Sequence, residues 1–277
     1  MRFGLSLFIW IDQLDRVSYL IEKACRLGYD LVEIPLLNIL SKDVGVIRHS
    51  LRRTGLECVG CVVLPREGDL TSSEDSIRLN GIRILKRCID ILATLDGDFL
   101  TGVTYAAWGK TKSLTPLEDW TRSVSALKEV CRYAAKLGVR IGIEPINRYR
   151  TYLVNTAEDA LKMINDIGEE NIGVHLDTYH MNIEEDDFRN PIILTGKKLY
   201  YFHCSENNRG ILGTGHIDWD SIFQALVEIG YNDCLTLETY TPSLRAIAWK
   251  RTIPSPDEIA LKSLEFLKAM VKKYFRG

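Results

Sequence analysis

Short apolar runs alternate with longer helical patterns along the chain, and this alternation restricts the possible folds more than any other feature. Eight runs are rich in β-favouring or aromatic residues and are bounded by turn residues. They cover residues 2–8, 30–36, 57–64, 99–105, 139–145, 172–178, 199–205 and 234–240. Such an alternation predicts successive βα units and a parallel sheet that is buried on both faces.

The segments between the runs have the apolar spacing of amphipathic helices. Segment 14–28 places Val17, Leu20 and Ile21 on one helix face and ends at Gly28, a suitable C-cap. Segment 184–198 has no clear pattern. The other predicted helices cover 42–54, 76–95, 117–138, 155–168, 218–230 and 255–275.

Eight βα units in 277 residues match the size of a (β/α)8 barrel. We therefore predict an α/β fold, a (β/α)8 TIM barrel, in which residues 1–277 form a single domain. A doubly wound open sheet is the alternative, but it would place a glycine-rich phosphate-binding turn after its first strand. Here the first run leads into "IWIDQLD", which contains no glycine.

The charge balance argues against several classes of partner, although it does not exclude a local basic patch. The formal net charge is −2, which provides no general attraction for nucleic acid or for an anionic membrane. No apolar stretch approaches the roughly 20 residues that span a bilayer, and the N-terminus lacks the pattern of a signal peptide. We expect a cytoplasmic protein with no nucleic-acid or membrane partner.

Seven cysteines are scattered through apolar segments. The "CVGC" sequence at 58–61 has the spacing of a zinc or redox motif, but it lies inside a strand-like run and no second CxxC accompanies it. An odd number of dispersed cysteines is typical of a reducing compartment. We therefore predict buried free thiols.

Polar residues lie at the ends of several predicted strands, where (β/α)8 barrels carry their chemistry. The second run carries Glu33. Four consecutive runs, the fifth to the eighth, carry Glu144, Asp177, His203 and Glu238. Because these four positions are each one βα unit apart, we expect their side chains to converge on one side of the barrel mouth.

Three carboxylates and one imidazole form a ligand set for a hard or borderline divalent ion. We predict one ion, with Mn²⁺ preferred and Co²⁺ or Mg²⁺ as alternatives, because a structural zinc site would use thiolates or more imidazoles. Taken singly, an acid after a strand is more often a helix N-cap, and a histidine such as His175 is more often a core residue. Without an ion, however, three convergent carboxylates would repel one another.

Several motifs resemble one known group of enzymes. They are "IEPINRY" (143–149), "HLDTYHMNIEEDDF" (175–188), "YFHCSENNRGILGTGHIDW" (201–219) and "LTLETY" (235–240). The chain resembles the ketose 3-epimerases of the D-tagatose/D-psicose/L-ribulose 3-epimerase group, within the xylose-isomerase-like sugar phosphate isomerase/epimerase superfamily. The resemblance implies metal-dependent epimerisation of a ketose at C3, a small-molecule sugar substrate, and a homodimer or homotetramer.

The resemblance also implies roles for individual residues. Glu144, Asp177, His203 and Glu238 match the metal ligands of the family, and Glu144 and Glu238 match its acid–base pair, which acts through a cis-enediolate. The residues that match substrate-holding or pocket positions are His180, Arg209, Glu206 and Trp108. We expect Trp108, with Trp10 or Phe8, to form an apolar wall against the sugar; packing in the core is the alternative for these aromatics.

One position departs from the family pattern. The family usually has NRFE or NRYE where this chain has "NRYR", so Arg150 stands where a substrate-contacting glutamate is common. If Arg150 contacts the substrate, it favours one with a carboxylate or phosphate, which arginine binds bidentately. The alternative is a side chain that points away from the pocket.

Other functions use a similar ligand set. An aldose–ketose isomerase, a hydroxypyruvate isomerase or an inosose dehydratase is the nearest alternative. A related DNA-repair endonuclease would need several zinc ions and more histidines than the five present here. A non-catalytic, metal-bearing sugar sensor would have no need of both candidate acid–base glutamates.

Overall fold

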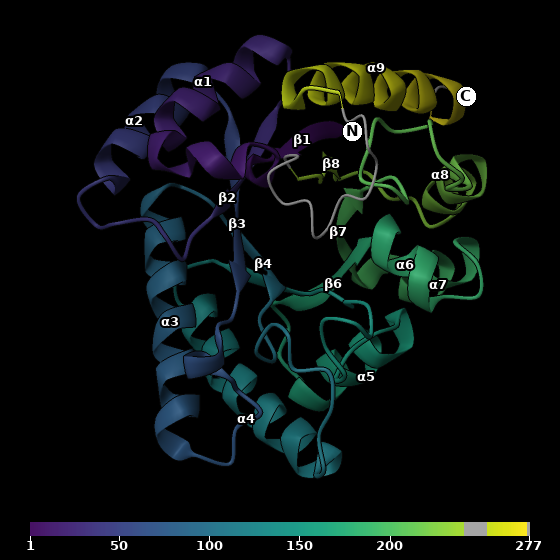
Figure 1. The fold of residues 1–277 in the computed structure, drawn as a ribbon. Helices are drawn as coiled ribbons and strands as arrows, with labels where there is room; N and C mark the ends of the chain where they lie inside the picture. The colour runs from purple at the N-terminus through teal and green to yellow at the C-terminus, as the bar shows by residue number, and fades with distance from the viewer. Residues whose placement is uncertain (241–253, 276–277) are drawn as a thin grey trace.

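The computed structural model describes residues 1–240 and 254–275. In this part of the chain eight parallel strands close into a barrel in the order β1 to β8, and helices surround it (Figure 1). The strands are β1 (Arg2–Ser6), β2 (Leu31–Pro35), β3 (Glu57–Val63), β4 (Phe99–Val103), β5 (Arg140–Ile143), β6 (Ile172–Asp177), β7 (Leu199–Cys204) and β8 (Cys234–Leu237). The predicted (β/α)8 barrel is confirmed.

The helices follow the predicted segments closely. The α-helices are α1 (Val17–Leu27), α2 (Val44–Thr54), α3 (Asp75–Thr94), α4 (Pro116–Ala135), α5 (Ala157–Ile167), α6 (Thr178–Glu184), α7 (Arg189–Thr195), α8 (Trp219–Glu228) and α9 (Pro256–Tyr274). The 3-10 helices are η1 (Leu7–Arg16), η2 (Arg66–Gly68) and η3 (Gly196–Lys198). The unclear segment after the sixth strand contains α7 and η3, which are too short to show a helical period. The single domain over residues 1–277 includes residues outside the described part and stays a prediction.

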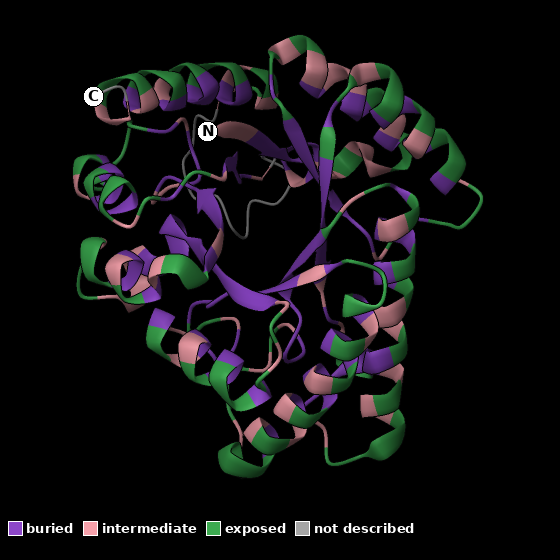
Figure 2. Ribbon diagram, turned by 180° about the vertical axis from the view of Figure 1, so that it is seen from behind, coloured by how far each residue is buried: buried purple, intermediate pink, exposed green. Residues whose placement is uncertain are grey.

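Local sequence signals set several helix ends. Gly28 ends α1 with φ +91°, and its N–H bonds to the carbonyl oxygens of Ala24 and Cys25. Thr156 and Asp159 form a reciprocal capping box at the start of α5. The helices lie on the outside of the barrel, where Figure 2 shows buried residues towards the strands and exposed residues on the outer faces.

The interior of the barrel is built in layers that follow the two-residue period of the strands. A layer of apolar and aromatic side chains closes one end; it contains Leu31, Val59, Phe99, Tyr201 and Cys234. Two residues further along each of these strands the side chains are more polar: Glu33, Cys61, Thr101, His203 and Thr236. All five are buried. The polar side chains of the barrel interior therefore lie nearer the C-terminal ends of the strands than this apolar layer does.

All seven cysteines are free thiols, as predicted, and six of them are buried. Cys58 and Cys61 both lie on β3, and burial raises the pKa of the Cys58 thiol to about 12. The CxxC spacing therefore reflects a strand in the core. In the described part of the chain no helix is long and apolar enough to cross a membrane.

Gly102 on β4 provides a test of the barrel packing. Its φ is +98°, and a Cβ at this position would lie 2.4 Å from the carbonyl oxygen of Val62. We expect Gly102→Ala to lower the free energy of unfolding by about 2 kcal/mol or more, because backbone strain and a backbone clash add. Urea denaturation measures this change.

The matched control is Gly55→Ala. Gly55 also has a positive φ, +73°, but a Cβ there would have no neighbour within 4 Å. We expect a smaller loss of about 1 kcal/mol from backbone strain alone. Equal losses in the two variants would show that close packing between β3 and β4 contributes nothing.

Candidate active site

The predicted ligand residues converge at the mouth of the barrel. Glu144 directly follows β5, Asp177 ends β6, His203 lies in β7, and Glu238 directly follows β8. Nδ1 of His203 is 3.9 Å from Oε1 of Glu144 and 3.7 Å from Oε2 of Glu238. Asp177 is linked to Glu238 by ion pairs with Arg209, whose Nη1 lies 3.2 Å from Oδ2 of Asp177 and 2.6 Å from Oε2 of Glu238.

Asp177 has two functions at once. Its Oδ1 accepts a 2.7 Å hydrogen bond from the backbone N–H of Tyr179 at the start of α6, so it is the helix N-cap. Its Oδ2 faces Arg209 and lies 3.9 Å from Nε2 of His180. The two interpretations of an acid at a strand end are therefore compatible for this residue.

Four carboxyl groups, those of Glu33, Glu144, Asp177 and Glu238, are buried together at this site. Burial raises the pKa of Glu144 well above its usual value, and the carboxylates of Glu238 and Asp177 add to this effect. Burial also raises the pKa of Glu238, to about 7, although Arg209 opposes the shift. The guanidinium of Arg209 overcomes the effect of burial on Asp177 and holds its pKa below the usual value.

The unpaired nitrogen of His203 indicates where a cation fits. Within the described residues Nδ1 of this buried imidazole has no hydrogen-bond partner, and it points between two carboxylates. Burial disfavours its charged form, yet the neighbouring carboxylates, first among them Glu33, raise the pKa of His203 to about 10. A divalent ion bound at Nδ1 would take the place of the second proton of this ring, and a nitrogen donor among buried carboxylates suits such an ion. Groups with ligand atoms close enough to hold one include Glu144 with Asp177 and His180, and Glu144 with His175 and His203.

His180 presents a hydrogen-bond donor to the site. Its Nδ1 accepts a 3.1 Å bond from the backbone N–H of Asn147 and lies 2.8 Å from the side-chain nitrogen of the same residue. Burial lowers the pKa of His180 to about 3, so the imidazole is neutral. Because Nδ1 is an acceptor, the proton of the neutral ring lies on Nε2, which faces the site.

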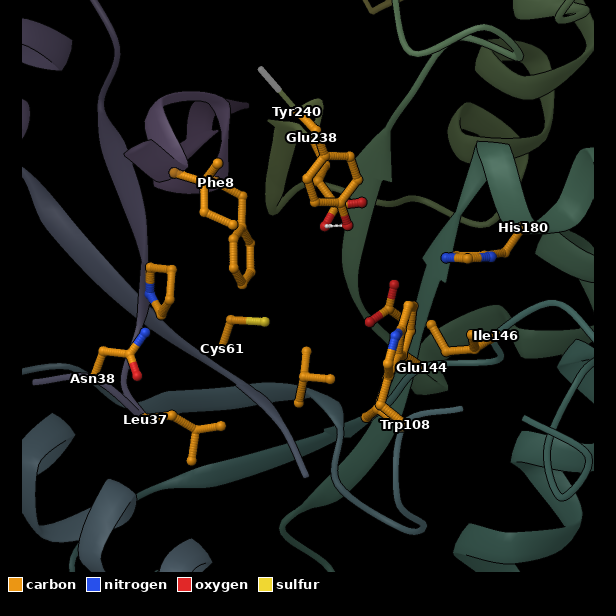
Figure 3. A pocket seen from close by; sticks show the side chains of 14 residues that line it. Phe8, Leu37, Asn38, Cys61, Trp108, Glu144, Ile146, His180, Glu238 and Tyr240 are labelled. Carbon is orange, nitrogen blue, oxygen red and sulfur yellow. Dashed lines mark hydrogen bonds between the residues drawn. The ribbon is translucent and has the colours of Figure 1, made fainter. Parts of the chain in front are cut away.

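A cavity of about 240 Å³ opens beside these groups. Figure 3 shows Glu144, Glu238 and His180 directed into it, the two glutamates from the ends of β5 and β8 and His180 from α6; the hydroxyl of Tyr240 donates a hydrogen bond to Glu238. The remaining wall is mainly apolar and consists of Phe8, Ile11, Pro35, Leu37, Asn38, Cys61, Val63, Val103, Trp108 and Ile146. Such a cavity accommodates a small molecule with one polar and one apolar side.

Of the aromatic residues considered for the wall, two line the cavity and one does not. Trp108 and Phe8 line the cavity. Trp10 takes the alternative role of core packing: it is buried among core residues, where its indole N–H donates a 2.9 Å bond to Asp257 and Lys23 stacks on its ring. Trp10 and Phe8 lie in η1, and the helical turn sends their side chains in different directions.

Arg150 lies next to the cavity wall. Its guanidinium carbon is 5.4 Å from the centre of the Trp108 ring, and the side chain is half-buried. The backbone of Arg150 is held by the N–H of Gly109, which bonds to its carbonyl oxygen. Arg150 therefore stacks on a residue of the wall and does not itself line the cavity.

Glu206 serves the loop between β7 and α8. Its buried carboxylate accepts hydrogen bonds from the backbone N–H groups of Asn207, Gly213 and Ile217 and from the indole N–H of Trp219, at 2.8 to 3.3 Å. It does not line the cavity. Within the same loop the carbonyl oxygen of Glu206 accepts a bond from the N–H of Arg209, whose φ is +53°. The structure thus gives Glu206 a role in shaping the loop that delivers Arg209.

Three residues of the site lie outside the predicted set. Glu33 bonds to His203 at 2.7 Å, and Asn147 orients His180. His175, expected only in the core, is buried directly beside the site, with its ring centre 4.1 Å from that of His203 and its Nδ1 2.8 Å from the hydroxyl of Thr101. The sequence did indicate that His175 lies near the site, because side chains alternate along a strand and residues 175 and 177 therefore share one face.

Known proteins share this fold and much of the sequence. The xylose isomerase-like TIM barrel family matches residues 21–270. A ketose 3-epimerase of Arthrobacter globiformis is 35% identical over 248 residues, which cover 89% of this chain and 86% of the relative. An L-ribulose 3-epimerase of Methylomonas sp. (strain DH-1) is 35% identical over 255 residues, with 90% and 89% covered.

The solved structures agree with these relatives. The crystal structure of a D-allulose 3-epimerase from Methylomonas sp. in complex with D-allulose has a TM-score of 0.91 and 33% identity, covering 98% of this chain and 97% of that one. The chain thus belongs to the xylose isomerase-like TIM barrel family. Within that family it belongs to the ketose 3-epimerase group, which confirms the resemblance found in the sequence motifs.

The contacts of Glu206 lead to a stability test. Glu206→Gln replaces one acceptor oxygen with an amide NH₂ that faces N–H donors, so buried donors lose their partner. We expect the free energy of unfolding, measured by urea denaturation without sugar, to fall by about 1–3 kcal/mol. The control is Glu228→Gln, which breaks an exposed ion pair with Arg189 and costs about 0–1 kcal/mol. Unchanged stability combined with a raised KM would instead support direct contact between Glu206 and the sugar.

Proposed function

We propose that this protein is a metal-dependent epimerase that inverts C3 of a ketose, with Glu144 and Glu238 as its acid–base pair. The observation that carries the proposal is the placement of two buried carboxylates directly after β5 and β8, both directed into one cavity (Figure 3) beside side chains that could hold a metal ion. The group to which the chain belongs supports the reaction type.

Epimerisation at C3 removes a proton next to the C2 carbonyl and returns one to the opposite face. We infer that one glutamate removes the proton and the other supplies one, through a cis-enediolate of the sugar. The two carboxyl groups have raised pKa values because burial disfavours their charge. A raised pKa brings a carboxyl group closer to neutral pH, where a general acid–base residue works best.

We propose that Glu144, Asp177, His203 and Glu238 hold one divalent ion, Mn²⁺ in preference to Co²⁺ or Mg²⁺. When bound, the ion supplies Lewis-acid stabilisation of the negative charge that develops on the sugar oxygens. Nε2–H of His180 is a donor on the cavity wall, and Arg209 contacts Glu238, which also lines the cavity. We infer that both hold the sugar oxygens near C2.

We assign the apolar wall, including Trp108, to the carbon face of the sugar. Arg150 stacks on Trp108 and places a positive charge next to this wall. Ketoses that carry a carboxylate or phosphate therefore belong among the substrates to be tested. The homodimer or homotetramer and the cytoplasmic location stay predictions.

The acid–base assignment is tested with Glu144→Gln and Glu238→Gln. We expect each variant to lower kcat by about 10²–10⁴-fold, because a positioned proton acceptor or donor is lost. The assay follows the loss of deuterium from C3 of D-psicose, D-tagatose and L-ribulose, with product analysis to detect any aldose. Aldose formation without exchange at C3 would favour an aldose–ketose isomerase.

The control for this assay is Glu118→Gln, an exposed acid in the first turn of α4, which should leave kcat unchanged. Metal content and thermal unfolding are measured on every variant. Wild-type rates in both glutamine variants would refute the two-carboxylate mechanism.

Removal of the metal is a separate test. Dialysis against a chelator should abolish activity, and Mn²⁺ or Co²⁺ should restore it. The same treatment should lower Tm, because a ligand that binds only the folded state stabilises it. Full activity in a sample that elemental analysis shows to be metal-free would remove the ion from the mechanism.

A further inference from the structure

Glu33 is a buried acid that the proposed mechanism does not use. It lies in the middle of β2 and has no exposed surface. Its Oε2 lies 2.7 Å from Nε2 of His203 on β7. In the barrel β2 and β7 are not neighbours, because β8 and β1 lie between them. The bond therefore crosses the barrel interior and joins two strands that share no backbone hydrogen bonds.

This bond decides which nitrogen of His203 faces the site. An imidazole has two nitrogens, and a hydrogen bond at one determines the role of the other. Here Nε2 is taken by Glu33, while Nδ1 has no partner within the described residues and points towards Glu144 and Glu238. A carboxylate that accepts Nε2–H leaves the lone pair of Nδ1 free for a metal ion.

The neighbours of His203 hold its ring in this orientation. The ring of Tyr201 lies 5.3 Å away at 61°, and that of His175 lies 4.1 Å away at 86°. His175 is itself held by Thr101. Both partners of the Glu33–His203 bond come from strands of a closed barrel, which vary less in position than loops do.

We propose that Glu33 is a positioning residue: its carboxylate orients the imidazole of His203 so that Nδ1 binds the divalent ion. The inference rests on the metal site of the proposed function. Carboxylate partners of this kind commonly change metal affinity 10–100-fold when they are removed. Direct ligation by Glu33 is the competing role, because its Oε1 has no partner within the described residues and Glu33, His203 and Glu238 also lie close enough to share an ion.

The test measures metal binding with the full-length chain. We expect Glu33→Ala to raise the Kd for Mn²⁺, measured by isothermal titration calorimetry, about 10–100-fold. Glu33→Gln should have a smaller effect, because its amide oxygen still accepts the bond from Nε2–H. The control is Ser6→Ala, which removes a buried, unpaired hydroxyl from the β1 residue opposite Glu33 and should leave Kd unchanged.

A second readout does not depend on activity or on a single variant. Nitrogen-15 NMR of the histidine ring in the Mg²⁺-loaded wild-type protein should show a proton on Nε2 and the metal on Nδ1. If Glu33→Ala does not fold, this spectrum and the Kd of Glu33→Gln carry the test. A folded Glu33→Ala variant with wild-type Kd, or a metal bound at Nε2, would overturn the inference. A Glu33→Gln variant that loses as much Mn²⁺ affinity as Glu33→Ala would overturn it in favour of direct ligation, because the amide keeps the hydrogen bond but not the anionic ligand.

Failure of the inference is separable from failure of the proposed function. A protein that binds Mn²⁺ through Nδ1 but exchanges no C3 deuterium in any ketose would refute the reaction and leave the role of Glu33 intact. Conversely, an active epimerase whose Glu33→Ala variant binds Mn²⁺ normally would refute only the role of Glu33.

Discussion

The burial of several like charges at one end of the barrel is the constraint on which the rest of the site depends. Glu33, Glu144, Asp177 and Glu238 are all buried, and Arg209 contacts two of them directly. Carboxylates removed from water repel one another and lose hydration, so each needs a compensating donor or cation. The raised pKa values of Glu144 and Glu238 show that this compensation is incomplete within the protein itself.

Strands and loops contribute different parts of the arrangement. The acids and His203 lie on strands or at their ends, where the closed barrel fixes their separations. Arg209 comes instead from the loop between β7 and α8, and a non-glycine residue with φ +53° needs support there. The carboxylate of Glu206 provides it by accepting four N–H bonds from the loop and from Trp219. The rigid part of the site thus suits metal binding, and the loops suit recognition of a particular substrate.

The sequence predicted the barrel and the convergence of Glu144, Asp177, His203 and Glu238 because these depend on one-dimensional patterns. The period of two within strands and the spacing of one βα unit between acids already determine which residues meet at the mouth. His175 is buried, as expected for a core residue, and the same rule explains why it also lies beside His203, since it shares a strand face with Asp177. Trp10 could not be placed, because η1 is a distorted helix with non-helical backbone angles at Trp10 itself.

By itself, the sequence determined the eight-fold alternation, the family and the set of acids at the strand ends. The tertiary structure alone decided the hydrogen-bond partners: Glu33 meets His203 across the barrel, Asn147 orients His180, and Glu206 shapes its own loop. The physical reason is how far apart along the sequence the interacting residues lie. Strand and helix patterns arise from residues within a few positions of one another, whereas the Glu33–His203 bond joins residues 170 positions apart that only the closure of the barrel brings together.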